Sequence, residues 1–290
     1  MQFAPRVKGN PLQGTSDPRL PVDTPSPAAT VTWLVGVRTD RGQVREHNED
    51  AWLSFQLAAG HANQPARCVG LFMVGDGAGG HRAGASASQL AVRIVARELL
   101  RRVVDPLVYV SDSAPSTQPI NEVLADGIGS AHWRIRRDLP QAATTLTLAL
   151  ALGRNIHVAH IGDTRLYRGS RIGLECLTQD HSMAERLMAV GQLLPEEAKP
   201  QRHQLYYALG QEADIVPDLA VFEAHEQDYF LLCSDGLWGQ VSDEDMASII
   251  DGADSAQDAC DRLIQRANQA GGQDNATALL MARHWPPRKA

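Results

Sequence analysis

Three stretches of the sequence place an aspartate beside glycine at the end or the start of an apolar run. They are FMVGDGAGGHRAG (72–84) with Asp76, LLCSDGLWG (231–239) with Asp235, and GGQDNATALLM (271–281) with Asp274. In an antiparallel sheet the end of one strand and the start of its neighbour share an edge, so we expect the three carboxylates to converge. Converging carboxylates repel one another unless a cation lies among them, and a set of oxygen ligands suits magnesium or manganese.

The first stretch also matches GxGxxG, the pattern of a dinucleotide-binding turn, through Gly75, Gly77 and Gly80. That fold needs a second strand soon after the first helix and an acidic residue about 20 positions beyond the glycines. Here the corresponding stretch (95–105) still has a helical pattern, and Asp76 between the glycines would repel a pyrophosphate. The pattern therefore does not indicate a dinucleotide site. A simple turn, in which Asp-Gly is common, remains an alternative for Asp76 taken alone.

Two further stretches carry charged side chains that bear on a metal site. RTDRGQVREHNEDAW (38–52) contains Arg45, Glu49 and Asp50, and HIGDTRLYR (160–168) places Asp163 after an apolar run. Taken singly, the first three are more typical of a solvated surface than of a functional site. Their role therefore depends on the rest of the chain.

The elements that position these residues follow from apolar periodicity and turn signals. Strands are predicted within 32–42, 51–57, 68–76, 143–152, 155–163, 164–169, 173–180, 228–236 and 275–282. Helices are predicted at about 83–104, stopped by Pro106, at 121–137, after Ser242 in capping-box spacing with Asp245, and near 255–269. The result is a single α+β domain with a mostly antiparallel sheet system and no internal repeat.

Composition limits the classes of function. The 290 residues are 43% hydrophobic and 21% charged, with a formal net charge of −7, so general nucleic-acid binding is not expected. No stretch is long and apolar enough to span a membrane, and residues 1–30, with six prolines, read as a disordered leader rather than a signal peptide. The four cysteines have no CxxC spacing and are expected to be buried free thiols of a reducing, cytoplasmic compartment.

Six motifs in order resemble the metal-dependent serine/threonine protein phosphatases of type 2C in their bacterial form. They are TDRGQVREHNEDAW, MVGDGAGGHRAGASAS, TTLTLALALGRNIHVAHIGDTRLYR, LTQDHS, LLCSDGLWGQVSDEDM and GGQDNATALLM. The likeness covers about 32–282. It implies an α+β fold, a sandwich of two antiparallel β-sheets flanked by α-helices with a dinuclear metal centre at one end. The domain is expected at 31–284 with a flap at about 181–210, and 285–290 form a tail.

The resemblance also implies roles for individual residues. Two Mn²⁺ or Mg²⁺ ions would be bound tightly, with a third, weaker ion associated with Asp163. Arg45 would hold the substrate phosphate, and Asp50 and Asn275 would contact the ligands rather than the metal. The implied ligands of the two tight ions are the bridging Asp76, together with Glu49, Gly77, Asp235 and Asp274.

These residues suit phosphomonoester hydrolysis, because two metals acidify a water and clamp the phosphate without a nucleophilic side chain. An arginine fork adds bidentate phosphate recognition. Ala78 departs from the family, which carries Met or His there, so the leaving group would take its proton from water, with His81 as an alternative donor. The implied partners are a phosphoprotein substrate and an opposing serine/threonine kinase, and the chain is expected to be monomeric.

Two other functions remain open at this stage. A catalytically silent relative would bind phosphoproteins without turnover, but such a relative would be expected to have lost metal ligands, and all are present here. A metallohydrolase acting on small phosphate esters has the same ligand requirements, and only substrate profiling separates it from a protein phosphatase.

Overall fold

The computed structural model describes residues 32–61, 64–79, 82–108, 118–170, 173–193 and 204–285. The predicted leader, all of the predicted tail but its first residue, and His81 lie outside these ranges. No helix within them is long and apolar enough to cross a membrane.

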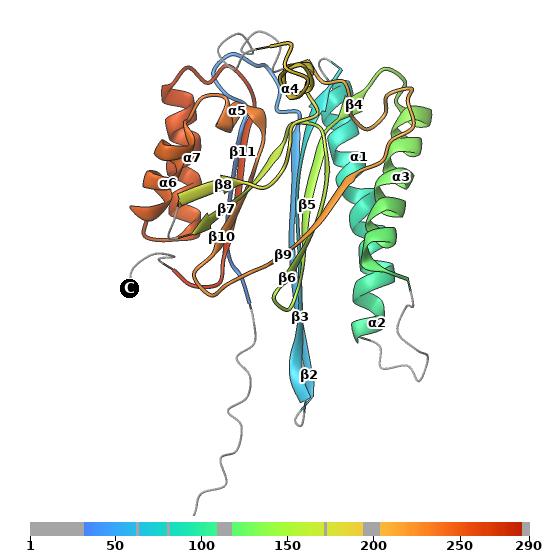
Figure 1. The fold of residues 1–290 in the computed structure, drawn as a ribbon, viewed down its shortest axis with the longest axis vertical. Helices are drawn as coiled ribbons and strands as arrows, with labels where there is room; N and C mark the ends of the chain where they lie inside the picture. The colour runs from blue at the N-terminus through green and yellow to red at the C-terminus, as the bar shows by residue number, and fades with distance from the viewer. Residues whose placement is uncertain are drawn as a thin grey trace, which may run out of the picture.

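Two antiparallel sheets face each other across the molecule (Figure 1). The first has the strand order β1 (Leu34–Asp40), β11 (Ala276–Ala282), β10 (Tyr229–Cys233), β7 (Arg165–Ser170), β8 (Gly173–Cys176). The second has the order β2 (Asp50–His61), β3 (Gln64–Ala78), β5 (Leu146–Leu152), β6 (Asn155–Ile161), β9 (Asp218–Glu223), and the short β4 (Ala143–Thr144) pairs with the end of β3. The predicted sandwich is confirmed.

Helices cover the outer face of each sheet (Figure 1). The second sheet is covered by α1 (Arg82–Leu99) and α3 (Ile120–Asp138), with η1 (Leu100–Val104) and α2 (Asp105–Val108) continuing α1. The first sheet is covered by α5 (Asp235–Trp238), α6 (Asp243–Asp251) and α7 (Ala256–Gln269). The helix α4 (Met183–Ala189) lies at the end of the sandwich where β3 terminates.

Three apolar clusters hold these layers together. One lies between α1, α3 and the second sheet, and another between α5–α7 and the first sheet. The third joins the inner faces of the two sheets, where Phe72 and Phe230 both pack edge-on against Trp33. Because central strands are covered on both faces, they read as nearly continuous apolar runs.

Several local predictions are wrong. The helix after β3 does not stop at Pro106, because η1 and α2 carry it to Val108 and the proline lies in the first turn of α2, where its missing N–H is tolerated. The strand β9 was not predicted. Of the four free cysteines, Cys68 is half-buried and Cys176 is exposed, so only two are buried.

Candidate metal centre

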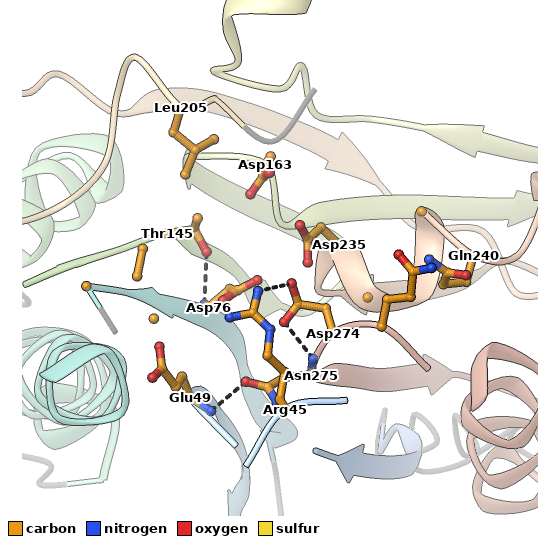
Figure 2. A pocket seen from close by; sticks show the side chains of 16 residues that line it. Arg45, Glu49, Asp76, Thr145, Asp163, Leu205, Asp235, Gln240, Asp274 and Asn275 are labelled. Atoms are coloured by element: carbon orange, nitrogen blue, oxygen red, sulfur yellow. Dashed lines mark hydrogen bonds and ion pairs between the residues drawn. The ribbon is translucent and has the colours of Figure 1, made fainter. Parts of the chain in front are cut away.

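A cavity of about 470 Å³ lies at one end of the sandwich, and it gathers nearly all of the predicted site. Figure 2 shows the carboxylates arranged around it, with Arg45 reaching across from the loop after β1. Eight predicted residues line the cavity: Arg45, Glu49, Asp76, Gly77, Asp163, Asp235, Asp274 and Asn275. The ninth, Asp50, does not line it.

Asp76 lies in a strand, not in a turn. β3 continues through Ala78, and Asp76 is paired across the sheet with Asp50 at the start of β2. Its main chain is held by the residues that precede β5: Thr145 accepts from Asp76 N through Oγ1 and donates from its own N to Asp76 O, both at 2.9 Å. Thr144 Oγ1 also donates to Asp76 O at 2.8 Å. These bonds fix the position of Asp76 at the cavity.

Close approach of neighbouring backbone and side-chain atoms requires glycine at positions 77 and 84. A Cβ on Gly77 would lie 2.2 Å from Gly84 O, and one on Gly84 would lie 2.2 Å from Glu49 Oε2. Gly77 N donates to Glu49 O at 3.2 Å. The two glycines therefore let the start of α1, the end of β3 and Glu49 approach closely, as a site built from several segments requires.

The short helix α5 brings Asp235 and Asp163 to the same cavity. A Cβ on Gly236 would lie 2.1 Å from Asn275 O, so only glycine lets α5 pack against the start of β11. Trp238, on α5, donates from Nε1 to the main-chain oxygen of Asp163 at 2.9 Å. Asp163 is buried, in the turn that leaves β6.

Arg45 and Asp274 form an ion pair across the cavity mouth. Arg45 Nη2 lies 2.6 Å from Asp274 Oδ2, and the arginine side chain is 53% exposed. Asn275 holds the loop that carries Arg45 and Glu49: its Nδ2 donates to the main-chain oxygens of Arg41 and His47, and its Oδ1 accepts from Glu49 N at 2.8 Å. Asn275 therefore fixes the position of the loop that carries Arg45 and Glu49.

Asp50 lies beneath the cavity among hydroxyl groups. Its Oδ2 accepts from Ser234 Oγ at 2.7 Å and from Thr277 Oγ1 at 2.6 Å, and its Oδ1 has no hydrogen-bond partner. Burial raises the pKa of Asp50 to about 7, against the lowering effect of the two hydroxyl bonds. The neighbouring charges of Asp235 and Asp274 raise it further.

The concentrated negative charge is the main electrostatic property of the site. Burial raises the pKa of Asp76 well above its usual range, and repulsion from Asp50, Asp235, Asp163 and Asp274 adds to this. No three His, Cys, Asp or Glu side chains of the described residues stand close enough together to hold an ion as placed. The donor set nevertheless fits hard divalent cations, because every side-chain donor is an oxygen and a cation would relieve the repulsion.

Sequence reasoning missed the residues that support and border the ligands. Thr144 and Thr145 could have been found, because two polar residues directly before an apolar strand indicate contacts at the sheet edge where the aspartates were expected. Gln240 and Gln273 border the cavity without a distinctive motif. Ala78 also lines it, and its methyl group cannot supply a proton.

Comparison with known proteins identifies the family. Residues 40–281 match the model of the protein phosphatase 2C family. The chain is 34% identical over 249 residues to the serine/threonine phosphatase stp of Listeria welshimeri, covering 85% of this chain and 94% of that protein. It is 31% identical to the protein phosphatase PhpP of Streptococcus pneumoniae, covering 86% and 96%. The chain therefore belongs to the protein phosphatase 2C family.

Solved structures agree with this assignment. The serine/threonine phosphatase of S. agalactiae superimposes with a TM-score of 0.74 at 31% identity, covering 87% of this chain and 99% of that one. The catalytic domain of the serine/threonine protein phosphatase PstP, solved in complex with two manganese ions, superimposes with a TM-score of 0.66 at 31% identity, again covering 87% and 99%.

Proposed function

We propose that this chain hydrolyses phosphoserine and phosphothreonine in proteins with the help of two divalent cations, manganese or magnesium. The observation that carries the proposal is the cavity in which five carboxylates and one arginine meet at the end of a family-typical sandwich. Bound there, the two ions would supply an acidified water and neutralise the phosphate oxygens. The manganese-bound PstP structure supports the choice of metal.

In this proposal Asp76 is shared by the two cations, since the charges of four other carboxylates act on it. Asp235 and Asp274 hold one cation. Glu49 and the main-chain oxygen of Gly77 hold the other. Asp163, on the adjoining turn, holds a third and weaker ion.

Arg45 is proposed to bind the substrate phosphate. Its guanidinium lies at the cavity mouth and is half-exposed, so it can turn from Asp274 to an incoming phosphate without leaving a buried charge unpaired. A cation held by Asp274 would supply that carboxylate with another counter-charge and would free Arg45 for the phosphate. The planar guanidinium then offers two parallel N–H donors to the phosphate.

Asp50 and Asn275 are proposed to act on the ligands rather than on the metal. Asn275 orders the loop that carries Arg45 and Glu49, and Asp50 lies across the sheet from Asp76. The opposing partner is proposed to be a serine/threonine kinase, with the phosphatase acting as a monomer in the cytoplasm.

The direct test is release of phosphate from a phosphothreonine peptide after dialysis against chelator. We expect no turnover in chelator and full turnover when manganese is added, because carboxylate sites of this kind exchange their ions readily. Full activity in excess chelator would contradict the dinuclear proposal. Hydrolysis of p-nitrophenyl phosphate without hydrolysis of phosphopeptides would instead favour a small-ester phosphatase.

A further inference from the structure

A basic and aromatic surface on α3 has no role in the proposed chemistry. Ser130, Trp133, Arg134 and Arg137 are exposed and recur at the spacing of one helix face, and with Arg136 they line an open hollow of about 760 Å³. We call these five residues the α3 patch. The opposite face of α3 is already buried against α1 and the second sheet, so folding does not require the patch.

The tryptophan of the patch is poorly explained by packing. Trp133 is 55% exposed, and the Arg136 guanidinium lies 5.2 Å from the centre of its ring. Large aromatic side chains left in water beside arginine are enriched where proteins recognise partners, since they supply apolar area and a donor together. The pair is therefore suited to hold an apolar side chain next to an acidic one.

The patch is positively charged on a chain of net charge −7. Arg134 and Arg137 both pair with the single carboxylate of Asp138. Arg136 donates to the main-chain oxygen of Glu212 at 2.9 Å and not to its carboxylate. The three arginines thus share one paired carboxylate, with the acidic Glu212 and Asp214 on the adjoining segment, and the guanidinium groups beside Trp133 favour contact with an acidic side chain of a partner.

The patch is connected to the metal cavity by residues 204–217. Leu205 lines the cavity, Gly210 N donates to His132 Nδ1 on α3 at 3.2 Å, and Glu212 is held by Arg136. Figure 1 shows this segment passing from the α4 end of the molecule to the end of α3 before it enters β9. Residues 204–217 therefore border the cavity at one end and the α3 patch further along the chain.

We infer that the α3 patch docks an acidic segment of the phosphoprotein substrate, one that also carries an apolar side chain and lies outside the phosphorylated residue. The inference rests on the proposed function and adds a substrate class to it: phosphoproteins with an acidic, partly apolar region at a distance from the phosphosite. Docking of this kind lowers KM without entering the chemical step.

The test compares two phosphothreonine peptides and p-nitrophenyl phosphate. The peptides share the phosphosite and a Gly-Ser linker, and one ends in a Glu/Asp-rich segment with two leucines while the other ends in Ser and Gly. The variants are Trp133→Ala and the double variant Arg134→Gln/Arg137→Gln. The matched control is Arg101→Gln, because Arg101 lies on η1, is 62% exposed, pairs with Glu98 of α1 and does not line the cavity.

We expect either patch variant to lower kcat/KM for the acidic peptide by about five- to thirtyfold, through KM, as for anchors of other interfaces. Activity on the other peptide and on p-nitrophenyl phosphate should stay within about twofold, and the difference between peptides should shrink in high salt. Equal effects on both peptides, or none, would overturn the docking role. If Trp133→Ala does not fold, the Arg134→Gln/Arg137→Gln variant tests the docking role, because exposed ion pairs add little stability and this variant should fold. If the unmodified protein hydrolyses neither peptide nor p-nitrophenyl phosphate, the proposed function itself is contradicted.

Discussion

Replacing Asp76 by asparagine separates a metal-bridging carboxylate from a structural one. The main-chain bonds from Thr144 and Thr145 to residue 76 remain in the variant, so the fold should be kept. The charge shared by two cations is lost. Removal of a mere hydrogen-bond partner of a metal ligand costs about 10- to 100-fold, so we expect phosphatase activity to fall by more than about 100-fold.

The same substitution should stabilise the protein in chelator. The folded-state pKa of Asp76 is raised, so the folded protein binds more protons than the unfolded chain above the ordinary carboxylate pKa, and ionisation costs stability as pH rises. Each unit of such a shift costs about 1.4 kcal/mol. The Asp76→Asn substitution removes this cost, and a gain on the order of 1 kcal/mol would raise Tm by about 2–4 °C. The gain should be present at pH 7 and vanish below about pH 4, where the unfolded-state carboxyl is also protonated.

Asp50→Asn is the matched control, since Asp50 lies opposite Asp76 but outside the cavity. Asparagine can still accept from Ser234 and Thr277, so we expect manganese binding to persist and activity to fall by less than about tenfold. Both variants are measured by phosphopeptide hydrolysis and calorimetric manganese titration, and Asp76→Asn is compared with the parent by thermal unfolding in chelator. Near-normal activity of Asp76→Asn with unchanged manganese stoichiometry would refute the bridging role.

Three further outcomes follow from the structure. Arg45→Ala should lower kcat/KM by roughly 10- to 150-fold, the worth of one charge-assisted bond, while calorimetry still shows manganese binding; parental kinetics would contradict phosphate binding by Arg45. Thr145→Val leaves Asp76 N without its acceptor, so we expect the free energy of unfolding in denaturant to fall by about 1–3 kcal/mol and manganese to bind more weakly. Thr145→Ser keeps the hydroxyl and should retain both properties. Equal losses in the Ser and Val variants would contradict the role of the hydroxyl. Burial lowers the pKa of His160 to about 3, so this histidine should contribute a loss of stability below about pH 6.5, by up to roughly 1.4 kcal/mol per pH unit, against the opposite contribution of Asp76. The difference in stability between His160→Gln and the parent in chelator should therefore change by that slope between about pH 6.5 and 4.5. A difference that does not vary with pH would contradict the assignment to His160.

Much of the site could be predicted because its aspartates occur where apolar runs end. Asp76 lies near the end of β3 in the second sheet, while Asp235 follows β10 and Asp274 precedes β11 in the first, each with one residue between. Antiparallel pairing of β10 with β11 brings Asp235 and Asp274 to one edge, and the facing second sheet adds Asp76. The loop residues Arg45 and Glu49 were harder, because only family resemblance distinguishes them from surface charges. Their placement in the cavity is observed, while their chemical roles stay predictions.

The remaining features depend on contacts between segments distant in sequence. A strand was expected to end at Asp76, but β4 pairs with Gly77 and Ala78 and extends it. Residues 143–152 were predicted as one strand, and the division into β4 and β5 within that stretch leaves no periodicity to detect. Likewise, the need for glycine at 236 comes from Asn275, which follows it by 39 positions and approaches only in the folded chain.

The carboxylates around the cavity are positioned through their main-chain atoms rather than through their charges. The Thr144 and Thr145 bonds to residue 76, the Trp238 bond to Asp163 and the Gly239 bond to Asp235 all engage main-chain atoms. Main-chain bonds survive any change in side-chain charge, so position and charge are separately controlled. Changing a holding residue should therefore alter metal affinity at constant charge, whereas changing a carboxylate should alter charge at constant geometry, which is why the Thr145 and Asp76 variants test different halves of the proposal.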